Sequence, residues 1–389
     1  MAINQRDHLD YYRPSQSLFC DHCERVADRY HLSDDLIRKE VLQDLDYDVV
    51  HGVSINDEKL FTVTTNQYQR YARTVILAVG PANKPSIPRL PSLPSGPLPQ
   101  ACHTFNIKRI PDPIVQARIV AKKPTNVLVI GGGLTSAQIS DLAIRQGVTK
   151  VWHFLRGNLM LKHFDVDLQW MGKYRNGEQA RFWSADSDEE RLEIIKEARG
   201  GGSMTTVYYK VLEKHMSANR LDLRVRTKVV DAKFETENGR GTWRITTDPP
   251  DETLPRMDYI YFATGIQTDF ATLPYLETML HKYPLQGFGG FPCITEDLTW
   301  KSDVPLFMTG KLAALQIGPA APNIGGAKIG AERVAWAIED LAGREGWDGV
   351  CGDDEEGEEE EGKGYLKGYM SGHGNMYDAL GLDVGPDGD

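Results

Sequence analysis

The sequence lacks the features of a membrane or secreted protein. No apolar run is long enough to span a bilayer, and residues 1–10 contain no apolar core of a signal peptide. Only five of the 389 residues are cysteine, and this odd, sparse set favours a reducing compartment over a disulfide framework. Basic residues form no patch that suits nucleic acid, and no ligand pattern predicts a metal site. We therefore expect a soluble cytoplasmic protein without membrane or nucleic-acid partners.

Acidic residues are abundant in one segment only. Residues 353–361 carry eight carboxylates and no basic group, which accounts for most of the net charge of −11. Such a run is typical of a solvated, disordered linker. We therefore expect an acidic linker and tail over 346–389. The remaining chain is nearly neutral and long enough for two domains.

The most informative segment spans residues 127–148. An apolar run ends in three glycines, a helix-forming stretch follows, and a second apolar run begins at Val148. This order predicts the strand–turn–helix–strand opening of a dinucleotide-binding unit, in which phosphates bind the free N–H groups at the helix N-terminus. Gly131 would make the tight turn, and Gly133 would let the backbone approach a pyrophosphate. Ser136 is small enough for the helix to pack on the strand. The predicted cofactor-binding residues of this loop are Gly131, Gly132, Gly133, Leu134, Thr135 and Ser136. A glycine-rich turn without a ligand is the alternative.

The chain has no acidic residue between Asp141 and Asp165, where a site for NAD or FAD would place the carboxylate that binds the ribose hydroxyls. Instead, Arg156 follows the second apolar run. A guanidinium there suits the 2′-phosphate of NADP(H). We expect Arg156 to bind this phosphate, with Lys150 and Lys162 as lesser candidates and a solvated loop arginine as the alternative.

Three further apolar runs, at 72–80, 258–265 and 304–310, each end in a glycine: Gly80, Gly265 and Gly310. Seven prolines lie between residues 81 and 99, and this density predicts a stiff connector between domains. A helix is expected after Asn323, which is a good N-cap residue. Its predicted apolar stripe comprises Ala327, Ala331, Val334, Ile338 and Leu341.

Two cysteines, Cys20 and Cys23, lie one turn apart on a predicted helix over 15–30. We expect both to face a core, because no strand precedes them and no second pair exists; a redox pair is the alternative. A charged helix is expected to begin at Ser187 and to end at the glycines 200–202.

These segments together resemble the flavoproteins that carry two dinucleotide-binding domains. The most similar are the flavin-containing monooxygenases, in the branch that includes the NADPH-dependent lysine and ornithine N-hydroxylases. The resemblance extends from about Tyr12 to about Leu341. It is carried by the residues 77–80, 131–136, 262–265 and 309–327 in that order.

The resemblance implies an α/β protein with two Rossmann-like units. The NADP-binding domain would cover 101–266, with an insertion over 157–205, and would divide an FAD-binding domain into 1–100 and 267–345. Gly80, Gly265, Gly310 and Asn323 would contribute to the cofactor sites. In that family NADPH reduces FAD, the reduced flavin reacts with molecular oxygen, and one oxygen atom is transferred to a small-molecule substrate.

The chain departs from the family at its front end, because no glycine loop for FAD precedes residue 131. We therefore expect an FAD domain that is incomplete at its N-terminus, and the alternative function is a catalytically inactive NADP(H)-binding remnant. A disulfide reductase has only Cys20 and Cys23 in its favour. His103 lies near the region where monooxygenases carry a His-containing fingerprint and is a weak catalytic candidate. The insertion carries four aromatic residues that would line a pocket or form its own small core: Phe164, Trp170, Phe182 and Trp183.

Overall fold

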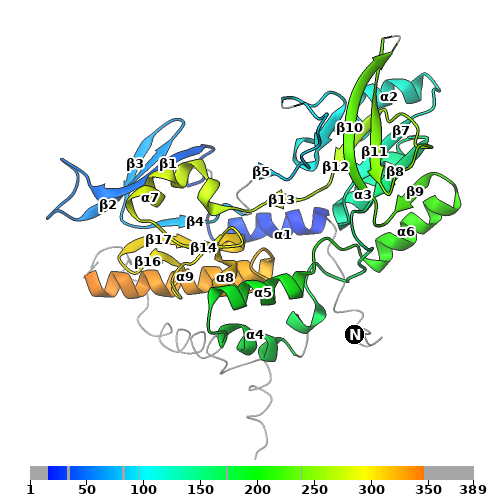
Figure 1. The fold of residues 1–389 in the computed structure, drawn as a ribbon. Coiled ribbons are helices and arrows are strands. Elements are labelled where there is room, and N and C mark those ends of the chain that lie inside the picture. The colour runs from blue at the N-terminus through cyan, green and yellow to red at the C-terminus, as the bar shows by residue number, and fades with distance from the viewer. Residues whose placement is uncertain are drawn as a thin grey trace, which may run out of the picture.

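The computed structural model describes residues 16–32, 36–80, 84–94, 96–171, 174–237 and 239–345. Two lobes are visible in Figure 1, and strands β5 and β13 form one of the connections between them. We call them the parallel-sheet lobe, which contains β6 to β12, and the α9 lobe, which contains β1 to β4, β14 to β17 and helices α4, α5 and α7 to α9. The predicted acidic linker and tail, 346–389, lie outside the described residues.

The parallel-sheet lobe is built on five strands in the order β6-β12-β7-β8-β9, all parallel. The strands are β6 (Ala101–His103), β7 (Asn126–Ile130), β8 (Lys150–Phe154), β9 (Leu221–Arg224) and β12 (Tyr259–Phe262). Strands β8 and β9 follow on one side of β7, whereas β12 and β6 lie on its other side. The order therefore reverses between β7 and β12, which is where doubly wound sheets bind their ligands.

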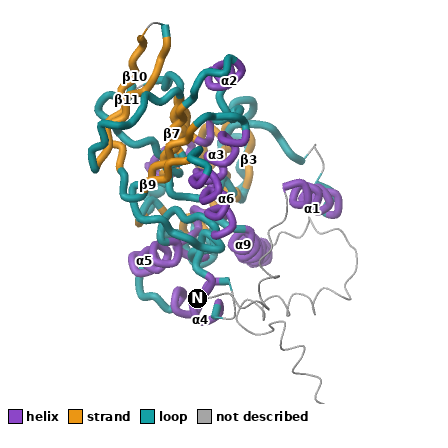
Figure 2. Tube along the Cα trace, turned by 90° about the vertical axis from the view of Figure 1, so that its right-hand side faces the viewer, coloured by secondary structure: helices purple, strands orange, loops and turns teal. Residues whose placement is uncertain are grey.

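Both faces of this sheet are covered, which explains its almost continuously apolar strands. On β7, Val127 and Val129 pack with the helices α2 (Pro113–Val120), α3 (Leu134–Arg145) and α6 (Thr206–Ser217). The alternate residues Leu128 and Ile130 pack with the hairpin β10 (Lys228–Glu237) and β11 (Arg240–Asp248). Figure 2 shows the hairpin and the helices on opposite sides of the strands.

The α9 lobe contains smaller sheets. Strand β4 (Val75–Leu77) is parallel to β17 (Val304–Met308), which pairs with β16 (Thr299–Lys301). A second, antiparallel sheet comprises β1 (Leu42–Val49), β2 (Lys59–Thr65) and β3 (Gln69–Ala72). The remaining helices and strands of the lobe are α4 (Arg175–Trp183), α5 (Asp188–Arg199), α7 (Glu277–Lys282), α8 (Ala314–Ile317), α9 (Ile324–Glu345), β14 (Gly287–Phe288) and β15 (Phe291–Pro292).

The two lobes are joined by paired linkers. Strands β5 (Lys84–Pro85) and β13 (Ile266–Gln267) form a short antiparallel ribbon between them. The proline-rich segment thus begins in this ribbon, whereas its residues Ile87, Leu90, Leu93 and Leu98 pack on the core of the parallel-sheet lobe. The Ser86 N–H donates to the Gly265 carbonyl at 3.0 Å, and the Thr264 hydroxyl donates to the Ser86 carbonyl.

The inserted segment does not form a core of its own. Trp170 and Phe182 are buried and lie edge to face at 6.2 Å, but they join the core of the α9 lobe around Phe307. Helix α5 adds Leu192 and Ile195 to the same core. Its ends follow the sequence prediction: the Ser187 hydroxyl accepts from the backbone N–H of Glu190, and Gly200 ends the helix in a left-handed conformation.

Helix α1 (Gln16–Arg29) confirms the predicted helix, but Cys20 and Cys23 are exposed. The expectation that they face a core is therefore wrong. Nearly every described residue of this helix is exposed, including Leu18 and Phe19. The apolar spacing that predicted a buried face thus has no core to pack against among the described residues.

The apolar stripe of α9 is also displaced from its predicted position. Ala327 and Ala331 are exposed, whereas Val334 is buried. The first turns instead approach neighbouring segments through two glycines. An added Cβ at Gly326 would lie 2.3 Å from the Ala320 carbonyl oxygen, and one at Gly330 would meet the Thr309 side chain. Glycine contributes nothing to an apolar pattern, so the sequence could not reveal this close approach. No helix in the described part of the chain is long and apolar enough to cross a bilayer.

Candidate functional site

The glycine loop lies where the strand order of the parallel sheet reverses. Gly131 follows β7 and is close to the end of β12, because an added Cβ would lie 2.2 Å from the Ala263 carbonyl oxygen. The turn at Gly131 therefore requires glycine for packing. Ser136 is fully buried at the first turn of α3, and its hydroxyl donates to the Gly133 carbonyl at 2.6 Å.

The start of α3 offers unused hydrogen-bond donors. The backbone N–H groups of Gly132, Gly133, Leu134 and Thr135 have no acceptor among the described residues. Gly133 is the N-cap residue and provides no side-chain cap. Free N–H groups and the helix dipole at such a position attract anions.

A buried histidine holds this loop in place. His153, on β8, donates from Nε2 to the Gly131 carbonyl at 2.9 Å, so its Nδ1 is the acceptor for the Ser140 hydroxyl at 3.2 Å. Complete burial lowers the pKa of His153 to about 4, which keeps the ring neutral. Sequence reasoning missed this residue. Its only signal is a histidine within an otherwise apolar strand.

Arg156 follows β8 at the same end of the sheet as the glycine loop. It is exposed, and no described residue forms an ion pair or hydrogen bond with it. Arg226 is nearby: its N–H donates to the Gly157 carbonyl at 2.9 Å and its Nε to the Asn158 side chain at 2.6 Å. The end of β8 thus presents exposed guanidinium groups beside the loop, of which only Arg156 was expected.

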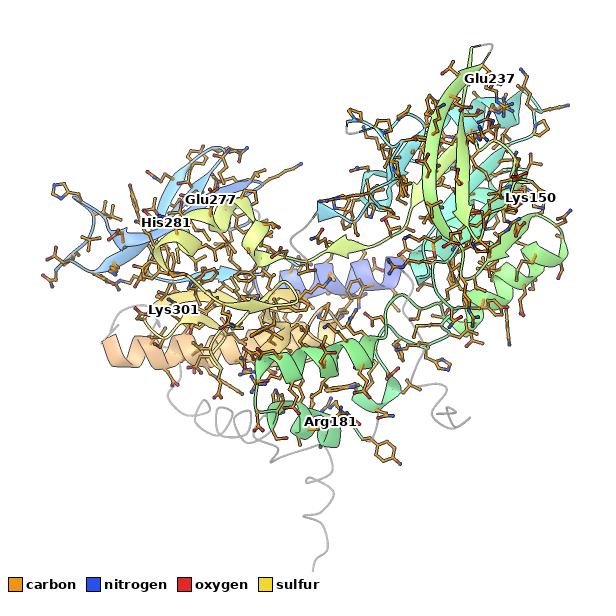
Figure 3. All side chains as sticks on the ribbon, in the orientation of Figure 1. Lys150, Arg181, Glu237, Glu277, His281 and Lys301 are labelled. Carbon is orange, nitrogen blue, oxygen red and sulfur yellow. The ribbon has the colours of Figure 1, made fainter. Side chains whose placement is uncertain are left out.

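The two lesser lysine candidates are engaged elsewhere. Lys150 lies at the opposite end of β8, where its ammonium donates to the Asn219 side chain at 2.9 Å; Figure 3 shows it at the outer edge of the lobe. Lys162 forms an ion pair with Asp167 at 2.9 Å and donates to the last carbonyls of α5. Lys150 is therefore too far from the glycine loop to bind a ligand there, and the Lys162 ammonium is already paired.

His103 is held by main-chain groups on both sides of its ring. Nε2 donates to the Gly265 carbonyl at 2.9 Å, and Nδ1 accepts from the Phe105 N–H at 3.3 Å. The side chain is 1% exposed, and this burial lowers its pKa. The two hydrogen bonds attach the end of β6 to the turn at Gly265. They leave no ring nitrogen of His103 available to a substrate.

Gly80, Gly265 and Gly310 follow β4, β12 and β17, and all three have positive φ angles between 63° and 79°. An added Cβ at any of them would meet no atom within 4 Å, so each turn needs glycine for its backbone conformation rather than for space. The three glycine turns that the sequence suggested are thus structurally equivalent.

A polar cluster of the α9 lobe lies near the end of β17. Arg199 donates to the Pro319 carbonyl at 2.9 Å and forms an ion pair with Asp165 at 2.6 Å, whose second oxygen accepts from the Asn323 amide at 3.2 Å. Burial and the Arg199 charge lower the pKa of Lys311. The ammonium of Lys311 has no described hydrogen-bond partner.

A cavity of about 280 Å³ lies elsewhere in the α9 lobe, between β2, β16 and the end of α9. Its walls include Lys59, Arg73, Asp297 and Asp340, and none of the site residues predicted from the sequence lines it. No group of three or more potential metal ligands occurs among the described residues.

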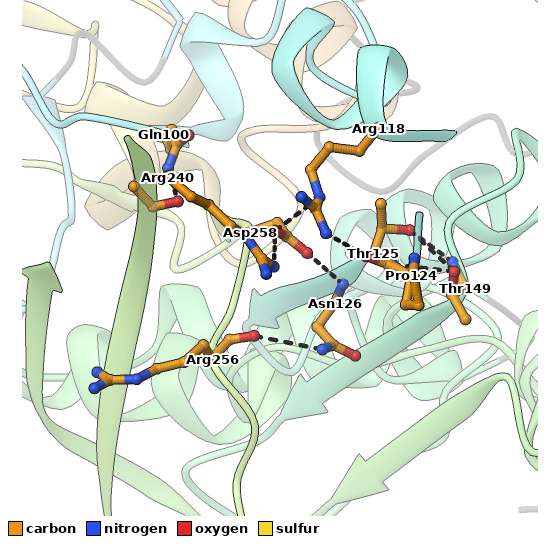
Figure 4. A network of polar contacts seen from close by, with 10 residues as sticks. Gln100, Arg118, Pro124, Thr125, Asn126, Thr149, Arg240, Arg256 and Asp258 are labelled. Atoms are coloured by element: carbon orange, nitrogen blue, oxygen red, sulfur yellow. Dashed lines mark hydrogen bonds and ion pairs between the residues drawn. The ribbon is translucent and has the colours of Figure 1, made fainter. Parts of the chain in front are cut away.

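The opposite end of the parallel sheet carries a structural network instead (Figure 4). Asp258 is 2% exposed and pairs with Arg118 at 3.1 Å and Arg240 at 2.7 Å. Its other oxygen accepts from the Asn126 N–H at 2.8 Å. This carboxylate joins the start of β12 to β7 and to the hairpin, far from the glycine loop.

The fold and the glycine loop define a dinucleotide-binding α/β oxidoreductase. The family model for L-lysine 6-monooxygenase/L-ornithine 5-monooxygenase matches residues 17–268, and the chain belongs to this family. This finding confirms the predicted resemblance and fold class. A comparison with curated proteins finds no match.

Solved structures of the family are similar in fold. The reduced ornithine hydroxylase of Pseudomonas aeruginosa aligns with a TM-score of 0.60 at 16% identity, over 84% of this chain and 76% of that one. The ornithine N-hydroxylase of Kutzneria sp. 744, solved with reduced FAD, NADP⁺ and L-ornithine, gives 0.59 at 16% identity, over 84% and 77%. The L-lysine 6-monooxygenase of Pseudomonas syringae gives 0.57 at 17% identity, over 86% and 80%.

Proposed function

We propose that the chain is an FAD-dependent monooxygenase that uses NADPH and molecular oxygen to oxidise a small molecule. Membership of the lysine/ornithine monooxygenase family supports this class of reaction. The observation that carries the proposal is the glycine loop at the reversal point of the parallel sheet, with unused N–H donors at Gly132 and Gly133 and an exposed Arg156 beside it.

The residues of the parallel-sheet lobe fit NADP(H). The first turn of α3 would hold the pyrophosphate through its backbone N–H groups, and Arg156 would bind the 2′-phosphate through paired donors. His153 would keep the loop in its binding conformation through the Gly131 carbonyl. Gly131, Gly132, Gly133, Leu134, Thr135, Ser136 and Arg156 are the proposed ligands and supporting residues.

The α9 lobe offers groups that suit the anionic parts of FAD. Lys311 is a half-buried cation, and the first N–H groups of α9 have no acceptor among the described residues. When bound, the flavin supplies the redox chemistry with oxygen. Gly80, Gly310 and Asn323 would shape its pocket, and Gly265 the turn between the lobes.

The substrate proposed is a small primary amine, since the family is named for hydroxylation of lysine and ornithine. We place its selectivity in the insertion, which borders both lobes and carries the exposed Trp183 beside Gln316. Oxygen transfer by a flavin needs no acid–base catalyst from the protein, so the ion pairs of this region, such as Lys162 with Asp167, need no catalytic role.

The test is a visible absorbance spectrum of the purified chain, recorded before and after addition of FAD and then NADPH under air. Flavin bands that bleach with NADPH and recover with oxygen support the proposal. L-Lysine, L-ornithine and cadaverine are then compared by hydroxylamine formation. Failure of all three would exclude the primary-amine assignment.

The second candidate is a catalytically inactive NADP(H)-binding protein. The observation in its favour is that the glycine loop with unused N–H donors lies in the parallel-sheet lobe, where NADP(H) is proposed to bind. Retention of NADPH binding without any retained flavin in the same experiment would favour this candidate.

A further inference from the structure

The insertion returns to the parallel-sheet lobe across the glycine loop. At Gly202 an added Cβ would lie 3.1 Å from the Gly133 nitrogen, 3.3 Å from the Gly132 carbonyl carbon and 3.4 Å from the Gly133 Cα. Such distances are shorter than ordinary van der Waals contact. Gly202 therefore packs directly on the Gly132–Gly133 peptide, and any side chain at this position would collide with the glycine loop.

The segment that carries Gly202 is anchored on both sides. Before it, Arg199 ends α5 and donates to the Pro319 carbonyl, which ties it to the α9 lobe. After it, Met204 is fully buried in the core of the parallel-sheet lobe, and its N–H donates to the Met160 carbonyl at 2.9 Å. Gly202 is held between these two anchors, so the segment has little freedom to withdraw.

The segment also carries unused donors. The N–H groups of Gly201, Gly202 and Ser203 have no acceptor among the described residues, as is true of Gly132 and Gly133 opposite them. Gly201 and Gly202 are solvent-exposed, so the position is accessible to a ligand.

We propose that Gly202 is a binding residue of the dinucleotide site, where residues 200–203 form a second backbone wall that faces the glycine loop. The pyrophosphate would lie across the exposed edges of both segments and accept hydrogen bonds from the N–H groups of each. Because α5 anchors this wall in the other lobe, dinucleotide affinity depends on how the lobes are arranged. The inference rests on the proposed function, since it assumes that NADPH binds at residues 131–136.

The experiment compares three variants with the full wild-type chain. Gly202→Ala places a methyl group beside the Gly133 nitrogen without a strained φ angle. Gly177→Ala, in α4 of the same insertion, has open space around it and is the matched control. Arg156→Ala removes the proposed 2′-phosphate ligand.

The ligands are NADPH, measured by calorimetry, and adenosine 2′-monophosphate, measured by saturation-transfer NMR. The second ligand has the 2′-phosphate but no pyrophosphate. We expect Gly202→Ala to raise the Kd for NADPH at least tenfold and to leave binding of adenosine 2′-monophosphate unchanged. Arg156→Ala should weaken both ligands, and Gly177→Ala neither.

Hydrogen exchange on the wild-type chain gives a second readout that needs no variant. NADPH should slow exchange at 200–204 as well as at 131–136. Protection confined to 131–136, or a Gly202→Ala protein that binds NADPH as tightly as wild type, would overturn the inference and leave the proposed function intact. A wild-type chain that binds no NADPH would overturn both.

Discussion

His153 and Gly131 are joined across two strands by a single hydrogen bond of 2.9 Å, from the imidazole Nε2 to the carbonyl of the first loop glycine. The bond needs a neutral ring whose other nitrogen accepts from Ser140. Because protonation would turn that acceptor into a donor, the position of the loop is linked to the charge of one buried side chain.

The first prediction concerns acid stability. The pKa of His153 is about 4 in the folded chain and near 6.5 when unfolded, so the unfolded chain takes up the proton first as pH falls. The neutral His153 ring therefore contributes to stability above pH 6.5, and this contribution is lost as the pH falls towards 4. The free energy of unfolding should decrease by about 2 kcal/mol from pH 7 to pH 5. Urea unfolding at both values tests it. His153→Gln should have a weaker pH dependence, and an unchanged slope would contradict the assignment.

The second prediction concerns nucleotide selectivity. Arg156→Ala should raise the Kd for NADPH by about 10- to 100-fold, the usual effect of losing a charge-assisted hydrogen bond, and leave the Kd for NADH nearly unchanged. Calorimetric titration of both nucleotides measures the difference. Lys150→Ala is the control, since Lys150 lies at the other end of β8. Equal losses for the two nucleotides would rule out the 2′-phosphate role.

The third prediction separates two neighbouring glycines. Gly131→Ala would force a Cβ against the Ala263 carbonyl oxygen and should destabilise the fold by about 2 kcal/mol or more. At Gly133 the nearest atom to an added Cβ is 4.0 Å away, so Gly133→Ala should keep its thermal stability but bind NADPH more weakly. Calorimetric unfolding and NADPH titration of both variants test the separation. Similar losses of stability would show that the loop is equally crowded at both positions.

The fourth prediction concerns Asp258. Replacing it by Asn leaves Arg118, which is largely buried, without its charged partner, whereas Arg240 is half exposed to water, and should cost about 1 to 3 kcal/mol of stability. NADPH affinity of the folded variant should be unchanged, because the network lies at the opposite end of the sheet from the glycine loop. Denaturant unfolding and NADPH titration give the two values. A loss of affinity without a loss of stability would contradict this separation.

Local patterns in the sequence were sufficient to predict the glycine loop and the glycine turns that follow three of the strands. An apolar run followed by Gly131, or by Gly265, reflects a strand end and a backbone turn, and both depend on neighbouring residues only. The limits of α5 were equally predictable, because Ser187 and Gly200 act within one helical turn.

The features that the sequence did not predict depend on contacts between segments that are distant along the chain. The burial of Trp170 and Phe182 was foreseeable, but the core that they join also contains residues far away along the chain in both directions, such as Phe61 and Phe307. The exposure of Cys20 and the close packing at Gly330 likewise depend on what lies opposite each helix. His153 was missed because its partners, Gly131 and Ser140, are brought together only by the crossing of β7, α3 and β8.

The burial of the insertion within the α9 lobe has a consequence for how the protein can be made and divided. The core around Phe307 is incomplete until residues 166–198 have joined it, although these residues lie between strands of the other lobe. The lobes therefore cannot fold one after the other as the chain emerges, and neither can be produced alone by cutting at the linkers. A fragment of 101–266 would expose the apolar side of α5 to water, and aggregation would be its expected fate.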